Sequence, residues 1–257
     1  MNLKAINDDG RKILSEHDNF RFGCHPGVSC FTRCCHDADM YLYPYDIIRI
    51  KNRLKVSSDQ FLKKGTITAY RDNPFFPSVM LKMSNRQGKP CQFLGEKGCE
   101  IYEDRPFSCR AYPIEPAVSR NQDSTRCTFY FLAEHKHCIG HKEPVYWSVS
   151  DWIEDQGLAP FTSMNENWVD MDTLFRKNPW GPQGLNSKAL KMAFMAAYNT
   201  DTFRNFVFES SFLKRFRIRS ERLEQVKESD ESLMLLGFDW IKFFLTGKGP
   251  LAEHSGL

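Results

Sequence analysis

The chain has 257 residues, of which 41% are hydrophobic and 26% are charged, and its formal net charge is +3. This composition is typical of a globular protein and excludes an intrinsically disordered chain. The positive charge is too small to indicate nucleic-acid binding by itself, so we do not expect a nucleic-acid partner.

No targeting or membrane segment is expected. The first twenty residues, MNLKAINDDGRKILSEHDNF, lack the apolar stretch of a secretory signal. The stretch SLMLLGFDWIKFFL near the C-terminus contains Asp239 and Lys242, and it is shorter than the ~20 apolar residues that a membrane helix needs. We therefore predict a cytoplasmic protein without a membrane partner.

The first feature along the chain is a dense cysteine cluster in the segment GCHPGVSCFTRCCHDAD. A disulfide knot, a nucleophilic thiol and a metal site would each use such a cluster. Cytoplasmic thiols are kept reduced, and the total of nine cysteines is odd, so disulfides are disfavoured. A nucleophile needs a base nearby in space, and His25 and His36 adjoin cysteines only in sequence. A metal site is the favoured interpretation.

The adjacent pair Cys34 and Cys35 bears on the kind of site. Neighbouring side chains point to opposite faces of a strand, or diverge by about 100° around a helix. We therefore expect the pair not to share one small tetrahedral ion. This favours a metal cluster, or two nearby sites, over a single structural zinc.

Helices and short strands follow the cluster. Residues 43–56 have an apolar stripe of helical period, with Pro44 and Asp46 in the first turn. A second helix is predicted over 57–65, capped by Ser57 or Ser58 and ended by Gly65. Two strands are predicted after it, separated by the turn RDNPFFP, at residues 66–70 and 78–84.

The segment PCQFLGEKGCEIYEDRPFSCRAYP, residues 90–113, is predicted to contain two turns. Gly95 and Gly98 indicate a tight turn between two extended pieces. Pro106 and Pro113 bracket a single turn that carries Cys109.

The remaining chain is predicted to be helical. Ser150 is the expected cap of the first of these helices. The five predicted helices cover residues 148–157, 165–177, 186–199, 201–210 and 230–247. The fold class is therefore mainly α with a few short strands. An irregular cysteine-rich metal-binding unit at 20–140 would pack on a helical C-terminal unit at 141–257, with which it could share one core.

Thiolates bind zinc and iron–sulfur clusters, and each site takes about four protein ligands. The chain has no C-x2-C pair of the kind found in zinc ribbons. The nine predicted ligands, enough for two sites with one left over, are Cys24, Cys30, Cys34, Cys35, Cys91, Cys99, Cys109, Cys127 and Cys138.

Polar neighbours of the cysteines have two interpretations. Arg105 and Arg110 could donate hydrogen bonds to sulfur and so help to hold the cofactor, or they could pair with nearby acidic residues. His135, His137 and His141 surround Cys138 in EHKHCIGH. They could complete a metal site, but a polar surface segment with one cysteine ligand is favoured.

The cysteine pattern resembles the YkgJ-type cysteine-cluster family, whose members are described as zinc- or iron-chelating proteins. The resemblance covers residues 20–140 and rests on the CC pair, on Cys91 with Phe93 and Leu94, and on the run CEIYEDRPFSCR at residues 99–110. The five-residue gap between Cys24 and Cys30 is wider than the family pattern.

The resemblance implies a metal-chelating function, and we favour iron, held as an iron–sulfur cluster. The same family includes flagellin lysine methylases, which implies an alternative: a protein lysine methyltransferase that uses S-adenosylmethionine with the cluster. Zinc binding without chemistry is a third interpretation. No G-x-G-x-x-G loop supports a nucleotide-binding unit, and no catalytic residue is assigned. A protein substrate or a redox partner is the expected partner.

Overall fold

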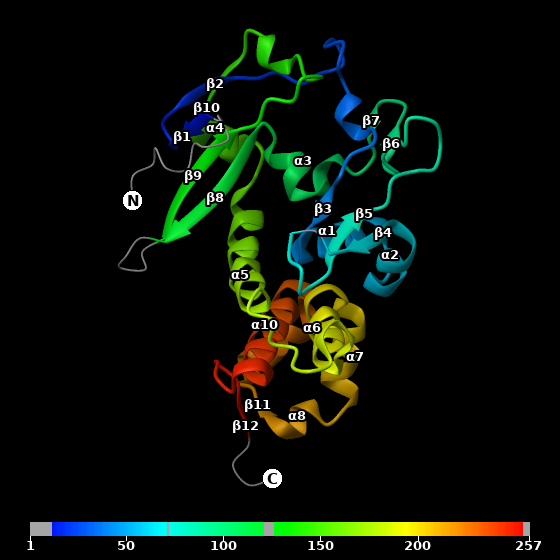
Figure 1. Ribbon diagram of the computed structural model, residues 1–257, viewed down its shortest axis with the longest axis vertical. Helices are drawn as coiled ribbons and strands as arrows, with labels where there is room; N and C mark the ends of the chain where they lie inside the picture. The colour runs from blue at the N-terminus through cyan, green and yellow to red at the C-terminus, as the bar shows by residue number, and fades with distance from the viewer. Residues whose placement is uncertain (1–11, 71, 121–125, 254–257) are drawn as a thin grey trace. The chain divides into compact units, whose positions relative to one another are not determined.

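The computed structural model describes residues 12–70, 72–120 and 126–253 (Figure 1). The chain forms two compact units, each made of three segments. The first unit comprises Met1–Ala38, Met83–Glu100 and Phe107–Pro160. The second comprises Asp39–Lys82, Ile101–Pro106 and Phe161–Leu257. All nine cysteine positions lie in the first unit.

The first unit is built on short antiparallel sheets. Its longest strands, β8 and β9, form a hairpin that β1 extends in the order β1-β9-β8, as Figure 1 shows. The strands are β1 (Lys12–Leu14), β2 (Asn19–Arg21), β6 (Leu94–Gly95), β7 (Gly98–Cys99), β8 (Ile114–Arg120), β9 (Arg126–Leu132) and β10 (Tyr146–Ser148). The helices are η2 (Arg33–Cys35), α3 (Phe107–Ala111), η4 (Gly140–Lys142) and α4 (Val149–Asp155). The first residues of α5 (Ala159–Phe175) lie at the end of the last segment of this unit.

An aromatic core holds this unit together. Trp152 of α4 packs edge-on against Phe20, Phe22 and Trp147, with ring centroids 5.1–6.0 Å apart. Its indole N–H donates to the carbonyl of Ala111 at 2.9 Å, so the polar end of the buried ring is satisfied. These contacts join α4 to β2, β10 and α3, the helix that carries Cys109.

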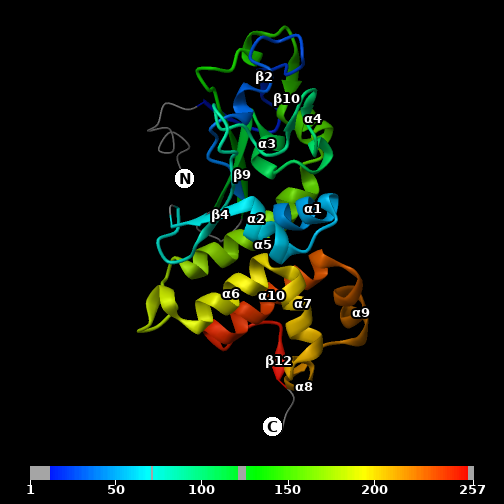
Figure 2. The same cartoon turned by 90° about the vertical axis from the view of Figure 1, so that its right-hand side faces the viewer.

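The second unit is mainly helical, and Figure 2 shows α6, α7 and α10 lying together. Its core includes Phe76, Phe175 and Phe203, each almost fully buried. The helices are α1 (Pro44–Leu54), α2 (Ser58–Gly65), η3 (Tyr102–Asp104), α5, η5 (Gly184–Asn186), α6 (Lys188–Tyr198), α7 (Thr200–Glu209), α8 (Phe212–Arg215), α9 (Ser220–Glu228) and α10 (Asp230–Thr246). The strands are β3 (Tyr41–Leu42), β4 (Thr66–Ala69), β5 (Ser78–Leu81), β11 (Phe216–Arg217) and β12 (Ala252–Glu253).

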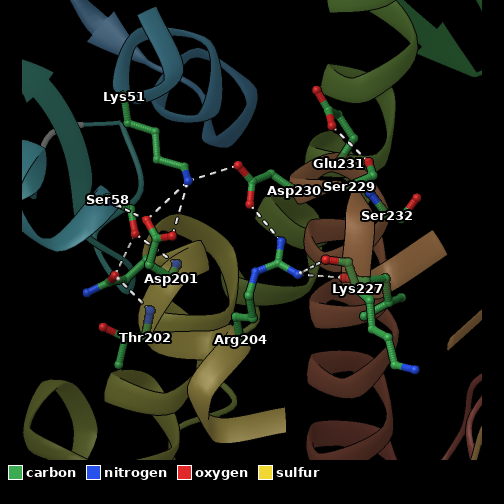
Figure 3. A network of polar contacts seen from close by, with 12 residues as sticks. Lys51, Ser58, Asp201, Thr202, Arg204, Lys227, Ser229, Asp230, Glu231 and Ser232 are labelled. Carbon is green, nitrogen blue, oxygen red and sulfur yellow. Dashed lines mark hydrogen bonds and ion pairs between the residues drawn. The ribbon is translucent and has the colours of Figure 1, made fainter. Parts of the chain in front are cut away.

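A buried polar network connects the helices of this unit (Figure 3). The Lys51 ammonium of α1 lies 3.1 Å from Asp201 of α7 and 2.8 Å from Asp230 of α10. Arg204 of α7 donates to Asp230 at 2.9 Å and to two backbone carbonyls at the end of α9. Asp201 also accepts from the amide of Ser58 at the start of α2.

Most predicted elements are confirmed, and the mainly α fold class with a few short strands is confirmed with them. In the described residues the structure has ten α-helices and small sheets. α1 begins at Pro44, with Asp46 accepting a hydrogen bond from the amide of Tyr43. α2 is capped by Ser57. The packing of the cysteine-rich unit on the helical unit stays a prediction.

Two predictions were incomplete or wrong. The cap of α4 is Ser148, whose hydroxyl accepts from the amide of Asp151 at 3.0 Å, and Ser150 is the second residue of the helix. α5 begins at Ala159 instead of residue 165, because Pro160 suits a first turn and Phe161 is buried. The β8–β9 hairpin and α9 were not predicted. No helix in the described part of the chain is both long enough and apolar enough to cross a membrane.

Candidate metal centre

The first and last cysteine segments lie side by side. Phe22 and Gly23 donate backbone hydrogen bonds to Val145 and Gly140, each at 3.0 Å. A Cβ atom on Gly140 would lie 2.7 Å from the carbonyl oxygen of Gly23, so only glycine permits this approach. The contact brings Cys24 and Cys30 to the segment that carries Cys138.

A second backbone contact joins the CC pair to the middle of the sequence. The amide of Cys91 donates to the carbonyl of Cys35 at 2.7 Å, and the amide of Asp37 donates to Lys89 at 3.0 Å. Lys89 and Asp37 also form an exposed ion pair at 2.9 Å. Cys91 is therefore fixed beside Cys35, although the two are far apart in sequence.

The predicted tight turn brings Cys99 to the same region. Gly95 and Gly98 close the β6–β7 hairpin, in which Leu94 is paired with Cys99. The amide of Leu94 donates to the carbonyl of Cys91 at 3.0 Å, which ties the hairpin to Cys91. On the next segment, Cys109 lies on α3 and is exposed.

The CC pair lies in a short 3₁₀-helix, and the expectation that the two cysteines do not share one tetrahedral ion stays a prediction. Cys34 and Cys35 lie in η2, directly after Thr32, which has a left-handed backbone with φ of 62°. The two thiols form a hydrogen bond. That hydrogen bond lowers the pKa of Cys34 to about 7 and raises the pKa of Cys35 well above its usual range.

Burial raises the pKa of other thiols in the group. The pKa of Cys24 is raised to about 11 by desolvation and then by the nearby sulfurs of Cys34, Cys138 and Cys30. Desolvation also raises the pKa of Cys91, against a hydrogen bond from the amide of Phe93. Metal coordination would reverse these shifts, because a bound cation favours the thiolate.

The eight cysteines with described side chains form one electrostatically connected group. The thiol of Cys35 interacts with those of Cys34, Cys109 and Cys91, and Cys91 interacts with Cys99. Within the described residues, none of these eight cysteines is in a disulfide. The side chain of Cys127, a residue of β9, lies outside the described part of the structure.

Two of these sulfurs accept backbone hydrogen bonds. The amide of Ile139 donates to Cys30 at 3.3 Å, and the amide of Phe93 donates to Cys91 at 3.5 Å. Hydrogen bonds of this kind stabilise a thiolate and tune metal–sulfur centres. The two amide donors therefore suit sulfurs that bind a soft metal as thiolates.

The sulfurs are neighbours but not a finished coordination shell. Within residues 12–70, 72–120 and 126–253, no three His, Cys, Asp or Glu side chains are arranged as ligands of one ion. Three of the cysteines, Cys24, Cys34 and Cys109, are exposed, and exposed side chains change rotamer quickly.

The two arginines that were predicted to help hold the cofactor both donate hydrogen bonds to backbone carbonyls. Arg105, in the second unit, stacks on the Tyr102 ring at 3.8 Å and donates to the Tyr102 carbonyl at 2.5 Å. Arg110 is buried and donates to the carbonyl of Gln156 at 2.6 Å. Their predicted part in holding a cofactor stays a prediction, as does the assignment of the nine cysteines as ligands.

Two features of the region were not expected. An open groove of about 840 Å³ runs along the β6–β7 hairpin beside Cys99, and its charged lining residues are His36, Arg86, Glu96, Lys97 and Glu100. The phenol of Tyr112 hydrogen-bonds to Cys138, and burial with this contact raises its pKa. Tyr112 is part of the recognised run that ends CRAYP, but nothing in the sequence indicated its contact with Cys138.

The comparison with known families agrees with the cysteine pattern. Residues 23–138 match the CxxCxxCC family, described as "Putative zinc- or iron-chelating domain". No curated protein and no solved structure matches the chain. The match begins beside Cys24 and ends at Cys138, so it spans all nine cysteines. The match is in keeping with the resemblance to YkgJ-type proteins.

Proposed function

We propose that the protein chelates iron through the cysteines of its first unit, as an iron–sulfur cluster. One observation carries this proposal: Cys24, Cys30, Cys34, Cys35, Cys91, Cys99, Cys109 and Cys138 come from four segments of sequence and interact in one group. Iron–sulfur clusters are held by cysteine thiolates, which accept N–H donors of the kind that Cys30 and Cys91 receive.

The number and spacing of the cysteines support a cluster in particular. The eight cysteines with described side chains exceed the four ligands of one tetrahedral zinc ion, and the chain lacks the C-x2-C pairs of zinc ribbons. The bound cluster would supply electron transfer or a site for an external ligand, and the protein would supply thiolates and amide donors.

Metal and sulfide analysis tests the proposal. The full chain is purified anaerobically, and iron, zinc and acid-labile sulfide are counted per chain. Iron with sulfide and a brown colour support the proposal. A colourless protein that contains zinc and no sulfide overturns it in favour of the structural zinc interpretation.

A second candidate function is S-adenosylmethionine-dependent methylation of a protein lysine. The groove beside Cys99 favours it, since Arg86 and Lys97 suit a carboxylate while Glu96 and Glu100 suit an amino group. Calorimetry on cluster-loaded protein tests this function. The function is supported if S-adenosylmethionine binds and if this binding weakens in Lys97→Ala. The control, Lys64→Ala at an exposed position of α2, should bind as the wild type does. If the wild type does not bind S-adenosylmethionine, this function is overturned.

A further inference from the structure

Three aromatic rings form a continuous stack that begins at the protein surface. The imidazole rings of His137 and His135 lie parallel, with centroids 5.4 Å apart and an interplanar angle of 3°. The ring of His135 lies parallel to Tyr112 at 5.3 Å and 8°. Both histidines are exposed, whereas Tyr112 is half-buried.

The inner end of the stack contacts Cys138. The phenol of Tyr112 hydrogen-bonds to the Cys138 thiol and lies 3.2 Å from Nε2 of His141. The amide of Cys138 donates to the carbonyl of His135 at 2.8 Å, which closes a tight turn around the two histidines. Phe22 packs edge-on against Tyr112 at 5.4 Å and so fixes the ring. The exposed imidazoles are thus held at one edge of the cysteine group.

The surroundings leave the two imidazoles available to a ligand. In the described part of the chain, the ring of His135 contacts those of His137 and Tyr112, and neither histidine forms an ion pair with a carboxylate. His25, by contrast, is held by Glu143 at 3.2 Å. Neutral imidazole is a good ligand for zinc, iron and cobalt ions.

We propose that His135 and His137 form the entry site at which a divalent transition-metal ion first binds before it passes to Cys138 and the neighbouring sulfurs. This inference rests on the proposed metal-chelating function. Two imidazoles and several waters bind an ion weakly, so it can leave readily. Both histidines are exposed, and exposed side chains change rotamer quickly, so each imidazole can turn a nitrogen toward an incoming ion.

Transfer to sulfur is an exchange of ligands. The ion loses imidazole and water and gains thiolate, and each thiol releases its proton to solvent as it binds. No oxidant or reductant takes part. The stronger thiolate bonds make the transfer favourable, and the short turn from His135 to Cys138 keeps the distance small.

The rate of cobalt loading tests the proposal. The reduced full-length chain is mixed anaerobically with Co²⁺ in a stopped-flow instrument, and the cobalt–thiolate absorption is followed to its end point. His135→Phe/His137→Phe retains the aromatic stack but removes both nitrogen ligands. Loading should slow at least about five-fold, with an unchanged end point. His17→Ala, an exposed histidine elsewhere in the first unit, is the control and should load at the normal rate.

Two results overturn the inference, and they are distinct. If the double Phe variant loads as fast as the wild type, the stack is only structural, and the chelating function stands. If the wild type itself develops no cobalt–thiolate absorption, the chelating function fails and the entry site fails with it. An equally slow His135→Ala/His137→Ala variant would further support ligation, because both variants lack the imidazole nitrogens.

Discussion

The backbone amide of Ile139 donates a hydrogen bond to the sulfur of Cys30 at 3.3 Å, across 109 residues of sequence. It joins the first cysteine cluster to the last cysteine segment. Cys30→Ala should therefore reduce metal content and also lower the free energy of unfolding of the chelator-treated protein by about 1 kcal/mol, because the amide loses its acceptor.

Cys30→Ser separates these two effects. Its hydroxyl can still accept from Ile139, so most of the stability should return, while the metal content stays low. Ser29→Ala, at the exposed neighbouring position, should change neither quantity. Full metal content in both Cys30 variants would show that Cys30 is not a ligand. Chemical denaturation and metal analysis provide the measurements.

Cys34 should be the most reactive thiol of the metal-free protein. The hydrogen bond from Cys35 lowers the pKa of Cys34 to about 7, whereas partial desolvation and the neighbouring sulfurs raise the pKa of Cys24 to about 11. The thiolate is the nucleophile, so iodoacetamide should label Cys34 first, with a half-maximal rate near pH 7. Cys35→Ala removes the donor and should shift this midpoint to higher pH. Mass spectrometry of the labelled peptides would detect it, and faster labelling of Cys24 would contradict the prediction.

Lys51 should be essential to the stability of the second unit. Its ammonium lies between Asp201 and Asp230, and only 6% of its side chain is exposed. Lys51→Met leaves Asp230 with Arg204 alone and removes the ammonium from Asp201, so it should cost about 1–3 kcal/mol in the free energy of unfolding. Lys63→Met breaks the exposed pair with Asp59 and should cost far less. Equal losses in urea denaturation would show that burial does not strengthen the Lys51 pair.

The same network predicts a pH dependence. Burial opposes ionisation of Asp230, but the hydrogen bonds and charges of Lys51 and Arg204 outweigh it and lower the pKa of the carboxyl. The stabilisation is therefore complete above the ordinary aspartate value of about 3.9 and is lost as pH falls through the lower value of the folded protein.

Asp230→Asn tests this dependence. The difference in stability between wild type and variant should be largest near neutral pH and should shrink as the pH is lowered from about 5 to about 2. Asp59→Asn, on the exposed surface, should show a weaker trend because solvent screens its charge. A difference for Asp230→Asn that is constant with pH would contradict the assigned contacts. Thermal unfolding at several pH values is the measurement.

Two serines separated by one residue test the cap of α4. Ser148→Ala removes the acceptor for the amide of Asp151 and should lower stability by about 1 kcal/mol. Ser150→Ala should change stability much less, because Ser150 lies inside the helix and its side chain is exposed. If Ser150→Ala lowered the stability more than Ser148→Ala, Ser150 would be the cap of α4, as the sequence suggested.

Local signals in the sequence determined much of the fold and indicated the chemistry. Pro44, Asp46 and Ser57 lie at the starts of helices. Their backbone preferences and hydrogen bonds act over only three or four residues, so α1 and α2 could be predicted from the sequence. The turn at Gly95 and Gly98 was predictable for the same reason. The spacing of the cysteines and the run around Cys109 indicated the family whose model residues 23–138 match.

Only the tertiary structure decided which groups meet. The approach of Gly140 to Gly23, the hydrogen bond from Cys91 to Cys35 and the contact of Tyr112 with Cys138 join positions whose separation in sequence carries no periodic signal. The left-handed backbone of Thr32, directly before the CC pair, likewise gave no turn signal, because Thr32 is not a glycine. Local propensity acts over one turn of chain, whereas these contacts are selected by packing of the whole unit, and packing cannot be read from spacing alone.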